Sequence, residues 1–259
     1  MNPFTEWEEV QRELVIRVQE IMDNERTKSQ FAGIKSRAEV LDDPLKMTRA
    51  APVSPSGQGG TVVQIIPITI EPQVPKVVEH GMPLPEGFQP GSLNLEHASG
   101  LMGRAMALKE SLKLIETLSE VAKTKIGYAD LDLDQECVNQ GLELINRSGF
   151  GPDRFVLNPS DKTYLSREKL LQVDGESYGD SQELSLCGWI SGMNAHVSSS
   201  LERGTSLAYV KDLVKLQSSP VKVYYDTSSG KPKLIFRSAI VASPMDDNSL
   251  VKFYFKPRD

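Results

Sequence analysis

The sequence predicts an α+β fold in which two long helices and several separate groups of strands share one chain. Residues 6–26 and 95–125 carry apolar side chains at three- and four-residue spacing, which is typical of amphipathic helices. Runs of β-branched and aromatic residues lie between and after these helices. Because strands and helices do not alternate in a repeated pattern, a doubly wound nucleotide-binding fold is disfavoured.

Size and composition are those of a globular protein with one or two domains. The 259 residues are 39% hydrophobic and 25% charged, so a sizeable core is expected. The formal net charge of -6 argues against a protein that grips nucleic acid directly, since that needs a concentrated basic face. No apolar run approaches the ~20 residues of a membrane span, and the acidic N-terminus does not resemble a secretory signal.

The first sixty residues are expected to form an arm that begins with an amphipathic helix. Thr5 and Glu8 have the spacing of a capping box. The apolar stripe that follows consists of Trp7, Val10, Leu14, Val18 and Ile21. Residues 27–60 lose this period and end in a proline-, glycine- and serine-rich segment, which is either a disordered linker or an arm that becomes ordered on a neighbour. Since that segment cannot cover the stripe, the stripe is expected to be buried against a partner molecule.

Residues 61–94 are expected to form a two-stranded extended loop. The segment 61–70 is rich in β-branched residues, and residues 77–86 are expected to form the return strand. Prolines recur from Pro72 to Pro90, and proline confines strands to sheet edges. An isolated hairpin of this kind is marginal in water, so it is expected to pack against another element.

Residues 95–125 are expected to form one long helix that ends before Gly127. Its length would be ~45 Å at ~1.5 Å per residue. The apolar face is too broad for the narrow seam of a coiled coil. Its expected members are Leu101, Ala105, Leu108, Leu112, Leu114, Ile115, Leu118 and Val121. Asp132 with Gln135 is expected to cap a second helix that ends at Gly149.

The two cysteines are expected to be buried free thiols, with a disulfide left open by the sequence. Cys137 lies on the second helix and Cys187 lies in an apolar strand.

The second half of the chain begins with a short buried strand at residues 154–158. Asn158 then caps a short helix whose first position is Pro159. A polar loop from Val173 to Glu183 leads to apolar segments at 184–190 and 192–197, which three serines follow. Further strands are expected at 220–225, 232–241 and 249–255, of which the first two form a hairpin.

This succession of strand, Asn-Pro helix, glycine-bearing loop and Gly-Met-Asn strand ending in serines resembles the axial domain of major capsid proteins. Those proteins come from tailed phages and related archaeal viruses and have the Hong Kong 97-type fold. Counting the arm, the loop and the long helix, the resemblance covers nearly the whole chain. It implies an N-terminal arm at 1–60, an extended loop at 61–94, a peripheral domain with the spine helix at 95–128 and 232–259, and an axial domain at 129–231.

The resemblance implies a structural protein of the virion, a major capsid protein that is not an enzyme. Such a protein self-assembles through pentamers and hexamers into an icosahedral shell around a double-stranded DNA genome, which it contacts weakly and non-specifically. Assembly in the host cytoplasm, without a membrane, can involve portal, scaffolding and decoration proteins. An encapsulin-type nanocompartment, which encloses cargo enzymes and holds them with its N-terminal helix, is the alternative.

Residues expected at the assembly interface come from three segments. They are Trp7, Val10, Leu14 and Val18 of the first helix, Ile66 and Ile68 of the extended loop, and Asp174, Glu176, Tyr178 and Asp180 of the polar loop. The polar loop carries too many acids to be packed inside one subunit, so it is expected around the ring axis. Some capsid proteins also cross-link a lysine of the extended loop to an asparagine of a neighbour, and Lys76 and Asn248 are candidates for this.

Motifs for catalysis and metal binding are incomplete. Ser166 and Lys169 have the spacing of a serine–lysine acyl-transfer motif, but its companion motifs are missing, so an acyl-transfer enzyme is the less favoured function. Three aspartates at 130, 132 and 134 alternate like the first calcium ligands, but Gln135 replaces the required glycine. The three histidines are isolated, so neither a zinc site nor a cofactor is expected.

Overall fold

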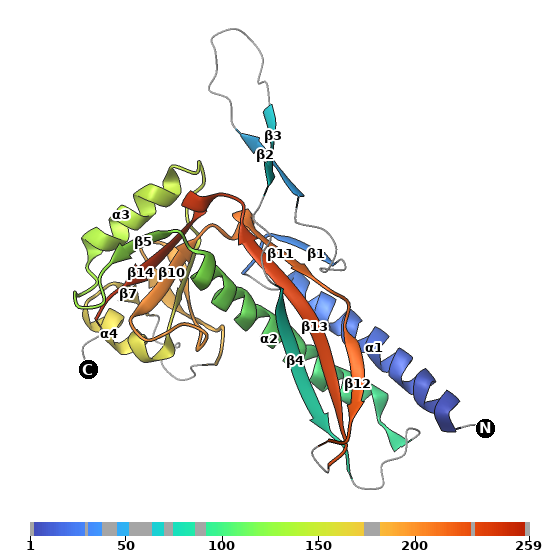
Figure 1. The fold of residues 1–259 in the computed structure, drawn as a ribbon. Helices are drawn as coiled ribbons and strands as arrows, with labels where there is room; N and C mark the ends of the chain where they lie inside the picture. The colour runs from blue at the N-terminus through green and yellow to red at the C-terminus, as the bar shows by residue number, and fades with distance from the viewer. Residues whose placement is uncertain are drawn as a thin grey trace.

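The computed structural model describes residues 3–28, 31–37, 46–51, 64–69, 75–85, 92–173, 182–228 and 231–256. Its described strands form sheets of seven, five and two strands. Figure 1 shows the seven-stranded sheet at one end of an elongated molecule, and the five-stranded sheet with the two long helices along the rest. The predicted α+β class is therefore confirmed. No helix in the described ranges is long and apolar enough to cross a membrane.

The elongated part of the molecule consists of a five-stranded sheet and two long helices. Helix α1 spans Pro3–Lys28 and helix α2 spans Leu95–Val121. The strands are β1 (Ile34–Arg37), β4 (Lys76–Pro83), β11 (Val214–Ser218), β12 (Lys222–Asp226) and β13 (Lys233–Pro244). Strand β13 is central, because β11 and β12 pair with one of its edges and β4 with the other. Both helices share one apolar core with the inner face of this sheet.

The compact end of the molecule is built on the seven-stranded sheet. Its order is β5-β14-β10-β6-β9-β8-β7. The strands are β5 (Thr124–Gly127), β6 (Arg154–Leu157), β7 (Leu171–Gln172), β8 (Leu186–Ile190), β9 (Met193–Val197), β10 (Thr205–Tyr209) and β14 (Leu250–Tyr254). Helices α3 (Gln135–Asn146) and α4 (Lys162–Arg167) cover one face and share its core. Residues of the other face, such as Leu207 and Tyr209, join the core of the elongated part.

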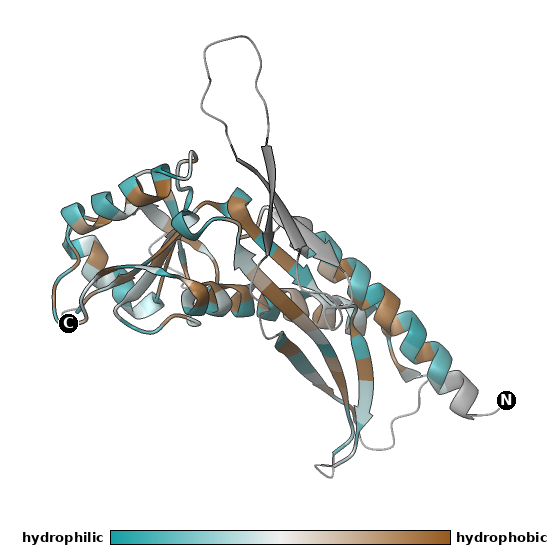
Figure 2. Cartoon of the chain, turned by 45° about the horizontal axis from the view of Figure 1, so that its top comes forward, coloured by the Kyte–Doolittle hydropathy of each residue, from teal (hydrophilic) through white to brown (hydrophobic). Residues whose placement is uncertain are grey.

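Several predicted elements are confirmed. Strand β6 occupies the predicted position, and the side chain of Asn158 accepts a hydrogen bond from Ser160 N at 2.8 Å. A 3-10 turn at Pro159–Asp161 and α4 follow. Strands β12 and β13 form the predicted hairpin, and α2 is the predicted long helix. Figure 2 shows hydrophilic and hydrophobic positions alternating along α1, as expected for an amphipathic helix.

Three helix ends differ from the prediction. Helix α1 begins at Pro3, before Thr5, so Thr5 lies inside the helix rather than at its N-cap. Helix α2 ends at Val121, and Gly127 instead closes β5 with a φ of 80°. The N-cap of α3 is Asp134 and not Asp132, since the Asp134 carboxylate accepts a hydrogen bond from Cys137 N at 2.8 Å. Closely spaced capping residues compete, and local spacing alone does not select among them.

The extended loop is assembled from a different pair of strands than predicted. Strand β3 (Gln64–Thr69) pairs with β2 (Lys46–Ala51), which precedes it, and not with β4. Strand β4 pairs instead with β13, from Lys76↔Ile240 to Pro83↔Lys233. The predicted hairpin at 61–94 is therefore wrong, because an apolar run does not specify its pairing partner.

Membership of the two larger sheets does not follow the boundaries predicted at residues 129, 231 and 232. Strands β11 and β12 lie within 129–231 but belong to the five-stranded sheet. Strand β14 lies within 232–259 but belongs to the seven-stranded sheet, between β5 and β10. The chain therefore crosses between the two halves more often than the resemblance implies. Its last described strand, β14, lies inside the seven-stranded sheet.

Candidate assembly surface

Helix α1 is packed into the core of its own chain. Leu14 and Val18 are both 0% exposed, and they share a core cluster with Leu114 of α2 and Phe236 of β13. A methyl group at Gly103 of α2 would lie 2.5 Å from Ile21 Cγ2, so the two helices approach closely only because Gly103 has no side chain. The expectation that the stripe lacks cover within the chain is therefore wrong for Leu14 and Val18.

The beginning of α1 reaches the end of the five-stranded sheet. The Trp7 ring lies 5.6 Å from the Tyr225 ring of β12, edge to face, and Trp7 is only partly buried. Val10 is also partly buried. Further along the helix, Gln19 Oε1 accepts a hydrogen bond from Val221 N at 3.0 Å. Trp7 and Val10 keep exposed surface, so a role for these two side chains in assembly stays a prediction.

For the other predicted interface residues, the structure describes either the backbone alone or nothing. Ile66 and Ile68 belong to β3, where their backbones pair with Arg49 and Met47 of β2. Asp174, Glu176, Tyr178 and Asp180 lie outside the described residues. Their place at the assembly surface remains a prediction.

Part of the broad apolar face that the sequence predicts on α2 is exposed. Leu101 is 45% exposed and Leu108 is 41% exposed, and Ala105 and Leu112 beside them are partly buried. The opposite face of the helix carries the fully buried Met106 and the core leucines. Residues at i, i+4, i+7 and i+11 lie on one side of a helix, so these four form a continuous stripe of about three turns. Within the described residues, no second layer covers this stripe.

The outer face of the five-stranded sheet also carries exposed apolar side chains. Val77 of β4 is 53% exposed and Tyr224 of β12 is 44% exposed. Between them, the guanidinium of Arg237 donates to Glu79 Oε2 at 2.8 Å and lies 5.5 Å from the centre of the Tyr224 ring. Both helices lie on the other side of the sheet, so among the described elements neither long helix covers this face.

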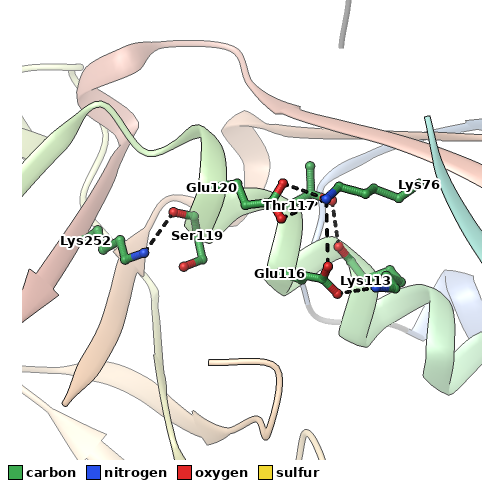
Figure 3. A network of polar contacts seen from close by, with 7 residues as sticks. All are labelled: Lys76, Lys113, Glu116, Thr117, Ser119, Glu120 and Lys252. Carbon is green, nitrogen blue, oxygen red and sulfur yellow. Dashed lines mark hydrogen bonds and ion pairs between the residues drawn. The ribbon is translucent and has the colours of Figure 1, made fainter. Parts of the chain in front are cut away.

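Two lysines, Lys76 and Lys252, connect strands of the two larger sheets to the last turns of α2 through hydrogen bonds (Figure 3). Lys76 Nζ of β4 donates to Glu120 Oε1 at 2.7 Å and lies 3.8 Å from Glu116 Oε1. Lys252 Nζ of β14 donates to Ser119 O at 3.2 Å. The hydrogen bond to Glu120 raises the pKa of Lys76 above its ordinary value. Lys76 is thus a charged contact between β4 and α2, and it would have to leave both carboxylates before it could attack an asparagine.

The catalytic look-alikes have no supporting geometry. Helix α4 ends at Arg167, and Lys169 lies beyond it with a φ of 60°, so Ser166 and Lys169 do not lie on successive turns of one helix. Lys169 is also exposed. Asp134, one of the three alternating aspartates, serves as the N-cap of α3. The described part of the chain contains no group of three or more histidine, cysteine or acidic residues arranged to hold a metal ion.

A pocket of about 570 Å³ lies between the second half of α1 and the start of α2. Its lining is mostly polar and carries both signs of charge. It consists of Arg17, Glu20, Ile21, Asn94, Glu96, His97, Ser99, Gly100 and Arg104. Two arginines and two glutamates leave no excess of charge for a single anionic or cationic ligand.

Solved structures with a similar fold are subunits of protein shells. A virus-like particle from Pyrococcus furiosus matches with a TM-score of 0.54 and 12% identity, over 95% of this chain and 98% of that chain. A procapsid of satellite phage P4 that includes a size determination protein matches with a TM-score of 0.54 and 9% identity, over 92% and 99%. The holo-SrpI encapsulin complex from Synechococcus elongatus matches with a TM-score of 0.50 and 12% identity, over 85% and 84%.

No protein-family model and no curated protein matches the sequence. The likeness is one of fold, and it spans nearly the full length of both this chain and the shell subunits. The chain therefore has the Hong Kong 97-type fold, the α+β fold that these capsid and encapsulin subunits share.

Proposed function

We propose that the chain is the major capsid protein of a tailed virus, which self-assembles through pentamers and hexamers into an icosahedral shell around double-stranded DNA. The observation that carries this proposal is the length of the fold match. Whole chains of a virus-like particle and of a phage procapsid are matched over 98% and 99% of their length. Since the match is to complete shell subunits, assembly is the function that the fold supports best, and no enzymatic activity is proposed.

In this proposal the compact half is the axial domain, and the half with the five-stranded sheet is the peripheral domain. The two-stranded β2–β3 sheet is the overlapping element. In Figure 1 it projects away from the five-stranded sheet, and among the described strands β2 and β3 pair only with each other. A sheet of two strands is marginal in water, so contacts with a neighbouring subunit would stabilise it.

The exposed stripe on α2 and the open sheet face are further candidate contacts. Fully burying an exposed leucine contributes ~1.5–3 kcal/mol, and Leu101 and Leu108 are 45% and 41% exposed, so together they offer about 1–3 kcal/mol per subunit to a neighbour or an enclosed protein. In a shell, each such contact is repeated in every subunit and acts on a partner that is already held nearby. Individually weak contacts are therefore sufficient.

Electron microscopy of the purified protein tests the proposal. We expect wild-type protein to form particles of uniform diameter in negative stain. A variant in which residues 46–69 are replaced by a short Gly-Ser linker should keep the circular dichroism spectrum of a folded subunit but form no particles. Replacing the β12–β13 turn at 228–230 with a linker of the same composition is the matched control, and it should still assemble. Wild-type protein that remains monomeric at high concentration would contradict the proposal.

An encapsulin-type shell is the second candidate, and the match to the SrpI encapsulin complex favours it. Encapsulins of this type hold cargo with the N-terminal helix, so a peptide groove beside Trp7 and Leu14 would favour this candidate. Leu14 is fully buried and so does not line an open groove, but a pocket lies farther along the same helix at Arg17 and Ile21. Particles purified from the native source separate the two: nuclease-protected DNA supports the capsid, and one co-purifying enzyme at fixed stoichiometry supports the encapsulin.

A serine–lysine acyl-transfer enzyme is the least favoured function, since Ser166 and Lys169 are not aligned on one helix. If the wild-type protein became acylated by a substrate and the Ser166→Ala variant did not, the enzyme hypothesis would be supported again. The net charge of -6 agrees with weak, non-specific contact to packaged DNA. Portal, scaffolding and decoration proteins are further partners of the proposed shell.

A further inference from the structure

His196 is a buried histidine where the seven-stranded sheet meets the segment that follows α1. It lies on β9 and is 3% exposed. The centre of its ring lies 5.0 Å from the centre of the Phe31 ring, with an angle of 72° between the planes. Phe31 is 5% exposed, so the two rings cover each other in the core.

The segment Phe31–Gly33, called the strap below, connects α1 to the five-stranded sheet. Ala32 is 1% exposed, and Gly33 N donates to Lys211 O at 2.8 Å. A Cβ atom at Gly33 would lie 2.5 Å from Asp212 Cα, so the strap lies directly against the turn before β11. After the strap, β1 pairs with β11. The strap is therefore held between the two halves of the molecule, with its ring on His196.

Only one ring nitrogen of His196 has a hydrogen-bond partner among the described residues. Nδ1 lies 3.2 Å from Leu184 O, and Nε2 has no partner. Because a carbonyl oxygen only accepts, Nδ1 carries the proton and Nε2 is the free acceptor of a neutral ring. A second proton on Nε2 would be a buried donor without an acceptor, and its charge would be buried too.

Among the described residues, the carboxylates near His196 already accept hydrogen bonds from other groups. Arg154, at the start of β6, adds a positive charge, and Asp153 beside it is already engaged: its Oδ2 accepts from Arg154 Nη1 at 3.1 Å, and its Oδ1 accepts from Lys211 N at 2.8 Å. On the side of β8, the Glu183 carboxylate accepts from Ser199 N at 3.0 Å. Burial is the largest influence on the pKa of His196 and lowers it; with the smaller effect of the Arg154 charge, it outweighs the hydrogen bond to Leu184 O and the charge of Asp153, which raise the pKa.

Leu184, the partner of Nδ1, is the first residue after the polar loop 173–183. Its φ is 64°, a conformation that is unfavourable for a leucine, and its N donates to Val197 O at 2.8 Å. The same imidazole therefore contacts the strap on one side and the foot of the polar loop on the other.

We propose that His196 is an acid-sensitive latch, which in its neutral form holds both the strap and the foot of the polar loop against the seven-stranded sheet and releases both when it is protonated. The proposal concerns the conformation of the single chain and does not depend on the proposed function. It links the mobility of two segments that lie far apart in the sequence to one proton.

The direction of the pH effect follows from proton linkage. The released histidine binds a proton more readily than the latched one, so the latched state is fully favoured above the ordinary histidine pKa of 6.5. As the pH falls below 6.5, the latched state is progressively lost. This loss ends once the pH is below the lowered pKa of the latched ring. Within this window, each pH unit raises the opening constant by up to about tenfold.

Hydrogen exchange of the full chain tests the latch. Between about pH 7.5 and about pH 5, after correction for intrinsic rates, exchange at Gly33 and Leu184 should accelerate by up to about tenfold per pH unit, while β10 stays protected. His196→Gln should abolish this acceleration. His80→Gln, which removes a partly buried histidine of β4, is the matched control and should retain it. Equal protection at both pH values, or unchanged acceleration in His196→Gln, would overturn the proposal.

A second measurement needs no variant. Exchange of the histidine C2 hydrogen, followed by mass spectrometry, reports the titration of each histidine in the wild-type protein. His196 should titrate below the ordinary histidine pKa of 6.5. Titration of His196 at or above that pKa would overturn the latch even if His196→Gln does not fold.

Discussion

The substitution Leu14→Ala distinguishes a helix that belongs to its own subunit from one that is covered only by a neighbour. Leu14 is 0% exposed in the single chain and lies in the core cluster that joins α1, α2 and the five-stranded sheet. Replacing a fully buried leucine by alanine typically costs ~2–5 kcal/mol, and more where the site cannot collapse. The helices already touch at Gly103, which restricts such collapse, so we expect a loss of ~3–5 kcal/mol.

Ile16→Ala is the matched control, because it removes an apolar side chain from the same helix. Ile16 is 51% exposed, so its truncation should cost less than ~1 kcal/mol. The assay is urea unfolding of unassembled subunits, followed by circular dichroism. We expect a lower midpoint for Leu14→Ala and a nearly unchanged midpoint for Ile16→Ala. If both variants unfold like the wild type and Leu14→Ala weakens only assembled shells, the stripe is an intersubunit contact and its placement in the core is wrong.

Three further outcomes are expected. If the polar loop lies at the proposed ring axis, changing Asp174, Glu176 and Asp180 to asparagine, glutamine and asparagine should weaken the pH and salt dependence of capsomer formation in sedimentation velocity, because fewer carboxylates would then repel one another. An unchanged profile would mean that the polar loop is not at that axis. Gly127→Ala should lower thermal stability by more than ~2 kcal/mol, since its φ is 80° and a Cβ atom would lie 2.2 Å from Tyr254 O. Gly149→Ala, with a φ of 83° and nothing within 4 Å of the added atom, should cost only ~1 kcal/mol, and equal losses would contradict this reasoning. At about pH 8 a thiol reagent should modify Cys137 before Cys187, because burial raises the pKa of Cys187 to about 11; equal labelling rates would refute this.

Elements with strong local signals were predicted correctly from the sequence. Asn158 caps the turn that Pro159 begins, and the two strands around the turn at 228–230 form a hairpin. Such features depend on residues within a few positions of one another, so spacing reveals them. Strand β10 was missed, although all five of its residues are buried. Its sequence, Thr-Ser-Leu-Ala-Tyr, is only weakly apolar, and its burial arises from β6 and β14 on its two edges and from packing on both faces.

Strand pairing and the contents of the candidate surface required the tertiary structure. The apolar run at β3 was recognised, but its partner is β2 and not β4, because hydrophobic patterning indicates a strand without naming its neighbour. For the same reason the sequence indicates one broad apolar face on α2 without showing which part of it is exposed. Its leucines have the same helical spacing as the buried ones, and no local signal separates the two sets.

Residue patterns alone predict the α+β class, the two long helices and the order of elements that resembles a capsid subunit, because period and turn chemistry are local properties of a chain. Which side of each helix is covered depends on tertiary packing. Leu14 is buried and Leu101 is exposed because the surfaces that reach them come from distant segments of the chain. The contact of His196 with Phe31 joins residues 165 positions apart (196 minus 31), and hydrophobic burial is satisfied by any apolar partner, so their meeting follows from the packing of the two halves and not from either local sequence.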